Sequence, residues 1–318
     1  MKKIALVLAF FCSFAAFAQD DDILTVNAPG KSRIRVSENS IVFNAGYNIP
    51  MLLNSELREN KFWNKKIGTG IDFNVDFRKQ FMKRVIEDEE VITEPTLFSV
   101  GIGLGISYMT KSMGFSNYAD TLHDFLDKDN DNCLVTLNYH NVKESASLIY
   151  LDIPLYLEIG RLNRIKPSGF FKIGLKPSVL ISKKIVGEGK YTSEGYYSQW
   201  NVMLDGIDHL EYYTDKECYL NAKNKNKDEY KLSPFVLWGT ISGGVNFPFS
   251  SPETNRLAKW ILRISVKIDY SLTPVSKSLS DSYYFKDAKF RLNQSNMMGG
   301  KGSRIFSPGV TISLIYCL

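Results

Sequence analysis

The sequence contains no hydrophobic run of the roughly 20 residues that a membrane-spanning helix needs, and the run near the N-terminus extends only from Ile4 to Phe14. Insertion of the remaining chain into a bilayer would require a closed barrel, because only helices and closed barrels satisfy every backbone polar group internally. Clusters of Lys and Arg interleaved with aromatic residues are also lacking, and the net charge of +5 includes Lys2 and Lys3. The sequence therefore predicts no nucleic-acid partner.

Cysteine is scarce: Cys12 lies in the N-terminal apolar run, and only Cys133, Cys218 and Cys317 follow it. Neither Cys133 nor Cys218 has a second Cys or a His at a recognisable ligand spacing, so no metal site is predicted. Both lie in long polar stretches of the chain. There they either pair as a disulfide or stay reduced.

The N-terminus has the layout of a cleaved secretory signal. Lys2 and Lys3 precede the apolar run, and the small-residue site Ala16-Phe17-Ala18 stands before Gln19. We therefore predict a signal peptide over residues 1–18, a polar lead over residues 19–39 and the folded domain over residues 40–318.

The clearest pattern runs from Ser147 to Ser182 and predicts two strands joined by a short polar connection. From Ile149 to Ile159 every second residue is Ile or Leu, and the residues between them are Tyr, Asp, Pro and Glu. Successive strand side chains point to opposite faces, so each strand has one apolar face. Both strands reach the roughly 9–11 residues that a tilted strand needs to cross a bilayer.

Six further segments alternate in the same way, which gives eight strands, the smallest even number that bacterial barrels use. The predicted fold class is all-β: an eight-stranded antiparallel up-and-down transmembrane β-barrel in the outer membrane of a Gram-negative bacterium. The count becomes ten if parts of the Lys183–Ser233 loop join the sheet. The eight predicted strands are residues 41–47, 68–78, 97–108, 147–159, 169–182, 235–247, 260–270 and 309–318.

Glycines at 101, 103 and 105 form a G-x-G-x-G run on the polar face of the third strand. A nucleotide-binding loop would place its third Gly later and would open a helix. We interpret these glycines as thinning one face of the strand to leave room inside a narrow barrel. No cofactor is predicted.

The connections alternate between long and short, which is typical of long extracellular loops and short periplasmic turns. One segment, Lys79–Pro95, breaks this rhythm because it is long and highly charged where a turn is expected. It is either a strand extension past the membrane or a short helix that places Phe81 and Val85 together. The long connections are Thr110–Ala146, Lys183–Ser233 and Ser271–Phe306, and the short ones are Gly160–Ser168 and Pro248–Lys259.

The sequence LDIPLYLEIG, followed by GFFKIGLKPSVLIS, resembles the signature region of the PorT-like outer-membrane β-barrel proteins of Bacteroidetes. The chain departs from that pattern in its longer loops and in ending on Tyr316-Cys317-Leu318 rather than on a terminal aromatic residue. The resemblance implies contact with outer-membrane lipid and insertion by the barrel-assembly machinery. It does not imply one function, because members include components linked to protein secretion. The matching residues are Leu151, Ile153, Pro154, Leu155, Leu157, Phe171, Gly174, Pro177 and Ser182.

Charged side chains of both signs lie on the polar faces of the predicted strands, which would line the barrel lumen. An eight-stranded barrel is just wide enough for side chains to fill its interior, and buried charges must be paired. We interpret these residues as a salt-bridged plug, with an ion path or substrate site as the alternative. They are Asp72, Asp76, Arg78, Asp152, Glu158, Lys172, Lys176, Arg263, Lys267 and Asp269.

The loop Lys183–Ser233 is rich in Tyr. Tyr and Trp provide a large contact area with few torsions, so this loop predicts a surface that binds an extracellular protein or glycan. In the alternative, the aromatic residues pack the loops on one another or extend the barrel as hairpins above the membrane. The residues are Tyr191, Tyr196, Tyr197, Trp200, Tyr212, Tyr213 and Tyr219.

The histidines His123, His140 and His209 all lie in predicted outer loops, and no Ser stands in a nucleophile-elbow context. We therefore expect a non-catalytic protein with a structural or binding role through its extracellular loops. One alternative is an accessory component of protein secretion or envelope assembly, in which Lys79–Pro95 binds a partner. Others are a small pore and a lipid-modifying barrel enzyme.

Overall fold

The computed structural model describes residues 25–28, 31–53, 64–65, 68–87, 90–126, 131–160, 162–164, 166–205, 216–221, 232–249, 258–276 and 303–318. No helix within these ranges is long and apolar enough to cross a membrane. The strands are β1 (Thr25–Ala28), β2 (Lys31–Asn48), β3 (Met51–Leu53), β4 (Asn64–Lys65), β5 (Thr69–Glu87), β6 (Glu90–Leu126), β7 (Asn132–Asp152), β8 (Leu155–Gly160), β9 (Ser168–Tyr197), β10 (Val202–Asp205), β11 (Lys216–Asn221), β12 (Phe235–Pro248), β13 (Trp260–Ser271) and β14 (Arg304–Cys317).

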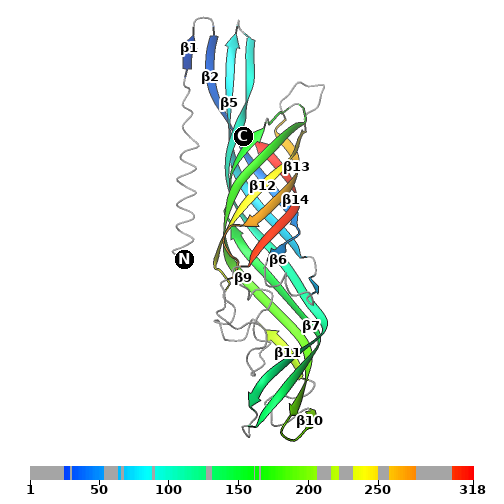
Figure 1. Cartoon of the computed structure of the whole chain (residues 1–318). Coiled ribbons are helices and arrows are strands. Elements are labelled where there is room, and N and C mark those ends of the chain that lie inside the picture. The colour runs from blue at the N-terminus through cyan, green and yellow to red at the C-terminus, as the bar shows by residue number, and fades with distance from the viewer. Residues whose placement is uncertain are drawn as a thin grey trace.

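Within the described residues, eight antiparallel strand positions close into a barrel (Figure 1). Their order is β2, β5, β6, β7 with β8, β9, β12, β13 and β14, and β14 pairs back onto β2. β7 and β8 form one barrel strand that is interrupted at Ile153 and Pro154. The backbone N–H of Gly103 bridges the break by donating to the Pro154 carbonyl over 2.9 Å. The predicted eight-stranded barrel is therefore confirmed.

β10 and β11 lie outside the barrel. Both pair with β9, but only from Val186 onward, whereas the pairing of β9 with β12 ends at Val179. These two strands therefore lengthen the structure without adding a barrel strand, so the ten-strand alternative is wrong for the described part of the chain.

The register sets the tilt of the strands. Following paired residues once around the barrel from Trp260 leads back to Tyr270 on the same strand, a shift of ten residues. With a rise of about 3.3 Å per residue and strands about 4.8 Å apart, this shift corresponds to a tilt of about 40°. A barrel of this size has room inside for side chains only.

The burial pattern is inverted relative to that of a soluble protein. Outward-facing Phe73 and Val266 are 60% and 61% exposed, whereas Arg78 and Glu158 are 0% exposed. Trp260 contacts Tyr316 at one end of the outer face, with ring centroids 4.6 Å apart, and Tyr270 lies at the other end of the same strand. This is the arrangement of apolar belt and flanking aromatic residues that a bilayer requires.

The two ends of the barrel differ. We call the end with the short connections 160–168 and 248–260 the turn end, and the opposite end the loop end. At the turn end β1, β2, β5 and β6 continue past the barrel as one sheet, seen clearly in Figure 1. Lys83 pairs with Glu94 and Glu87 with Glu90. Lys79–Pro95 is therefore a strand extension, and residues 31–39 of the predicted lead belong to β2.

At the loop end β6, β7 and β9 continue together beyond the barrel (Figure 1). Phe115 pairs with Val142, and Asn138 with Thr192. Much of the connection Thr110–Ala146 and the first part of Lys183–Ser233 are therefore paired strand. The first part of Lys183–Ser233 therefore extends the barrel as paired strand, which agrees with the alternative of hairpins above the membrane.

The barrel interior has three layers. The loop-end layer is apolar and includes Tyr150 and Trp238, whose rings meet edge to face with centroids 6.2 Å apart. Past the ends of β12 and β13, the Ser233 N–H donates to the Val275 carbonyl over 2.8 Å, and Leu232 and Val275 are buried. The middle layer is charged. The turn-end layer is a second apolar cluster that consists of Val42, Leu162, Ile261, Ile315 and Cys317.

Candidate functional site

The structure places all ten predicted charged residues in the middle layer of the lumen. Nine are buried and Lys172 is half-buried. Five are acidic and five are basic, so their formal charges cancel. The acidic residues are Asp72, Asp76, Asp152, Glu158 and Asp269, and the basic residues are Arg78, Lys172, Lys176, Arg263 and Lys267.

Glu158 of β8 bridges two arginines from other walls of the barrel. Arg263 of β13 forms a bidentate pair with it, at 2.7 Å from Nη1 to Oε2 and 2.9 Å from Nη2 to Oε1. Arg78 of β5 donates from Nη2 to Oε1 over 2.9 Å. Ser99 and Asn246 accept further hydrogen bonds from these guanidinium groups, at 2.8 Å and 2.7 Å. This cluster ties three strands together across the lumen.

A second cluster lies around Asp269. Lys176 Nζ lies 2.7 Å from Asp269 Oδ2, and Lys267 Nζ lies 3.6 Å from the same oxygen. Lys267 also pairs with Asp72 over 2.7 Å, and Lys176 lies 3.9 Å from Asp152. Paired lysines and carboxylates alternate through this cluster, which keeps each buried charge close to an opposite one.

Glycine residues on β6 leave room for the charged network. A Cβ on Gly103 would collide with the Asp76 carboxylate, and a Cβ on Gly101 would collide with the Tyr156 ring. Asp76 accepts a hydrogen bond from Asn44 Nδ2 over 3.0 Å. The geometry supports the interpretation that these glycines thin the inner face of a narrow barrel.

Little space is left between the charges. A cavity of about 50 Å³ lies among Asp152, Tyr156, Lys172 and their neighbours. This volume accommodates a few water molecules, each of which needs roughly 10–15 Å³. Since apolar layers cover it at both ends, the described part of the lumen is a filled interior rather than a channel.

The predicted aromatic surface is only partly brought together. Tyr197 is 2% exposed and packs on Trp200 with centroids 5.4 Å apart, while half-buried Tyr196 donates its hydroxyl to Asn201 Oδ1 over 2.9 Å. Trp200 itself is exposed. Tyr191 lies in β9 and Tyr219 in β11, but their side chains are outside the description. Tyr212 and Tyr213 lie outside the described residues.

Sequence reasoning missed the apolar residues beside Trp200. Trp200, Val202, Met203 and Leu204 are 56%, 39%, 59% and 41% exposed, and they form what we call the apolar tip, at the turn from β9 to β10. Three consecutive apolar residues after a Trp in an otherwise polar loop were the available signal. These three residues do not alternate with polar ones, so they do not show the pattern of a membrane strand.

A closed ring of tilted antiparallel strands, apolar outside and charged inside, is the architecture of an outer-membrane barrel. The chain matches the family model described as "Outer membrane protein beta-barrel domain" over residues 17–277. The chain belongs to this family. The match extends through β13, and a comparison with curated proteins finds no significant match. Family and fold together support location in the outer membrane.

In this outer-membrane barrel the two loop cysteines are far apart. Leu134, next to Cys133, pairs with Tyr196 of β9, whereas Cys218 pairs with Gly189 of the same strand. Cys133 therefore lies level with Tyr197, eight residues from Gly189, which is roughly 26 Å along β9. A disulfide needs Cα atoms within about 7 Å. The structure does not bring these cysteines together.

The predicted histidines fall at the loop end of the barrel as far as they are described. His123 is exposed on β6, and His140 Nδ1 lies 2.9 Å from Asn117 Oδ1. His209 lies outside the described residues. The charged lumen is thus separated from both described histidines by the apolar layer at the loop end.

Proposed function

We propose that this protein is a non-catalytic outer-membrane barrel that binds an extracellular protein through the apolar tip of its β9–β10 hairpin. The observation that carries the proposal is the exposure of Trp200, Val202, Met203 and Leu204 in one short segment. Contiguous exposed apolar side chains are uncommon on surfaces that face only water, and they commonly mark interaction sites.

The chemistry of the apolar tip favours a protein over a glycan. Trp is a frequent hot-spot residue at protein interfaces, and Met adapts to irregular partner surfaces. Val, Met and Leu offer no hydrogen bonds to sugar hydroxyl groups. Asn201, which lies between Trp200 and Val202, already accepts a hydrogen bond from the Tyr196 hydroxyl through its Oδ1.

The strand extension supports a role outside the cell. β9 continues for 18 residues from Val179, its last partner position with β12, to Tyr197, which is roughly 55–60 Å of strand. Long connections of outer-membrane barrels are extracellular. A hydrogen-bonded extension holds the apolar tip away from the membrane at a lower entropic cost on binding than a free loop would incur.

The test is site-specific photo-crosslinking on intact cells. A photoreactive residue at Met203 should give a discrete cross-linked protein, and the same residue at exposed Asn132, at the end of the neighbouring β6–β7 hairpin, should give none. W200A combined with L204S should abolish binding of the protein identified in this way, while the barrel still folds. Equal products from both sites, or no product from Met203, would reject the proposal.

A second candidate is an accessory role in secretion or envelope assembly, in line with the PorT-like resemblance. The observation that favours it is the sheet of β1, β2, β5 and β6 beyond the turn end, which would project into the periplasm (Figure 1). The backbone N–H and C=O groups at the edge of such a sheet, and its charged residues, could contact a periplasmic partner. The lumen would have no part in this interaction.

The register allows a precise deletion for this second candidate. Because Lys83 pairs with Glu94, residues 84–93 can be removed and the two strands rejoined through an Asn-Gly turn without a change of register. We expect the deleted protein to fold as a barrel and export of secreted proteins to fall. Normal export with a folded, shortened barrel would reject this second candidate.

A further inference from the structure

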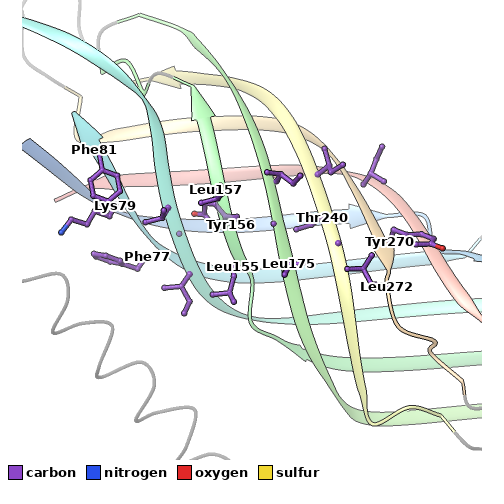
Figure 2. A pocket seen from close by; sticks show the side chains of 18 residues that line it. Phe77, Lys79, Phe81, Leu155, Tyr156, Leu157, Leu175, Thr240, Tyr270 and Leu272 are labelled. Atoms are coloured by element: carbon purple, nitrogen blue, oxygen red, sulfur yellow. The ribbon is translucent and has the colours of Figure 1, made fainter. Parts of the chain in front are cut away.

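An apolar groove of about 1210 Å³ crosses the outer face of the barrel, independently of the apolar tip and the lumen. Its wall is formed by outward-facing side chains such as Leu155, Leu175 and Ile241. Figure 2 shows Lys79 and Phe81 at one end and Tyr270 and Leu272 at the other. The groove therefore runs from β5 across β6, β8, β9 and β12 to β13.

The groove is deepened where an outward-facing position carries no side chain. Gly239 of β12 lies in register between Leu175 of β9 and Tyr270 of β13. A Cβ added there would meet only the Leu272 side chain, at 3.5 Å, which is ordinary contact distance. The barrel wall at Gly239 is bare backbone between larger neighbours.

The length and slope of the groove match one leaflet of a bilayer. Five strand spacings of about 4.8 Å separate β5 from β13, which is about 24 Å. With strands tilted by about 40°, this path rises roughly 15 Å along the membrane normal. That is half of a hydrocarbon core of about 30 Å.

The positive charge of Lys79 at the turn end of the groove indicates which kind of lipid headgroup would bind there. Lys79 lines the groove at the turn end, near the level where Asn39 and Leu318 mark the end of the barrel wall. Lysines at this depth extend their ammonium group to the membrane interface and attract anionic lipid. Apart from Thr240, the other residues that line the groove are apolar, Gly or Tyr, so the acyl chain is bound mainly by its contact area.

We propose that this groove holds one acyl chain of an anionic phospholipid from the leaflet at the turn end, with its phosphate at Lys79. The chain lies over Gly239, and the headgroup is selected by the Lys79 ammonium. The site is a lipid-binding site on the barrel wall, and it does not depend on any extracellular or periplasmic partner.

The test is native mass spectrometry of the full-length protein in detergent, titrated with phosphatidylglycerol or phosphatidylethanolamine. We expect one phosphatidylglycerol to bind several-fold more tightly than phosphatidylethanolamine, and K79Q to lose about fivefold for phosphatidylglycerol only. G239L fills the groove and should weaken both lipids about tenfold. The matched control is G243L, on the same strand and outside the groove, where a Cβ meets no atom closer than 3.5 Å.

Each variant is first checked for heat-resistant migration, which reports a folded barrel. If G239L does not fold, L175W fills the same groove from β9. Equal lipid affinity in G239L or L175W and in G243L would overturn the proposal. It would also be overturned if lipopolysaccharide, a lipid of the opposite leaflet, competed for the same position more strongly than phosphatidylglycerol.

Discussion

Glu158 is the residue on which the lumen network depends most. It forms an ion pair with Arg78 and another with Arg263, and all three side chains are at most 2% exposed. A buried cation that loses its partner keeps its desolvation cost without the compensating attraction. Glu158 is important because its one negative charge is shared by two buried cations.

We predict that E158Q lowers the free energy of unfolding by about 3–5 kcal/mol. The measurement is urea unfolding in lipid vesicles. Its matched control is E38Q, which removes the more exposed pair between Glu38 and Arg164, and which should cost about 1 kcal/mol or less. A loss for E158Q no larger than that for E38Q would show that the network is not structural.

Gly101 is the second residue with a specific role. G101A should destabilise the barrel by about 1–3 kcal/mol, because the new Cβ collides with the Tyr156 ring on the neighbouring strand. In a Y156L background the same change should cost clearly less. G243A, where a Cβ makes only ordinary contacts, should be close to neutral. Additive effects of G101A and Y156L in the double variant would contradict this account.

At the scale of elements, the connection between β8 and β9 does more than reverse the chain. It places Leu162, which is 5% exposed, into the turn-end layer against Val42, Ile261 and Ile315. This connection therefore acts as a plug for the turn end of the lumen. A short turn that only joined two strands would leave those residues uncovered.

We expect L162A to cost about 2–5 kcal/mol, since it leaves a cavity that the surrounding strands cannot close. I312A removes atoms from the lipid-facing side of β14, where acyl chains fill the space, and it should cost much less. Both are measured by unfolding in vesicles. Similar losses for the two variants would mean that the turn-end layer is not closely packed.

At the scale of the whole molecule, three interior layers close the lumen of the described barrel. The wild-type protein should therefore give no stable conductance steps in a planar bilayer. E158Q should also stay silent, because the apolar layers at both ends remain in place. A wide porin recorded in parallel verifies the assay. Steady ion conductance by the wild-type protein would favour the small-pore alternative.

The orientation of the whole barrel leads to a further prediction. In a cysteine-free background, S198C beside the apolar tip should react with a membrane-impermeant thiol reagent on intact cells. K259C, exposed at the turn end, should react only after the envelope is disrupted. The reverse pattern would place the apolar tip in the periplasm and would remove the basis for an extracellular partner.

The barrel wall was predictable from the sequence because its physics is local. Successive strand side chains point to opposite faces. In a membrane barrel the outward face must be apolar and the inward face can be charged, so apolar and polar residues alternate in segments such as Ile149–Ile159 and Trp260–Tyr270. The eight membrane strands and the assignment of all ten lumen charges to their polar faces follow from the same alternation. No long-range information was needed for them.

The tertiary structure decided what depends on partners distant in the sequence. Pairing of Lys83 with Glu94, and of Asn138 with Thr192, showed that these connections continue as paired strands outside the membrane, where no alternation is imposed and the sequence left alternatives open. Likewise, Glu158 meets Arg263 across 105 positions of sequence, and Gly239 deepens a groove only because β9 and β13 flank it. Alternation identifies the face of each side chain, but register and closure of the ring determine which side chains meet.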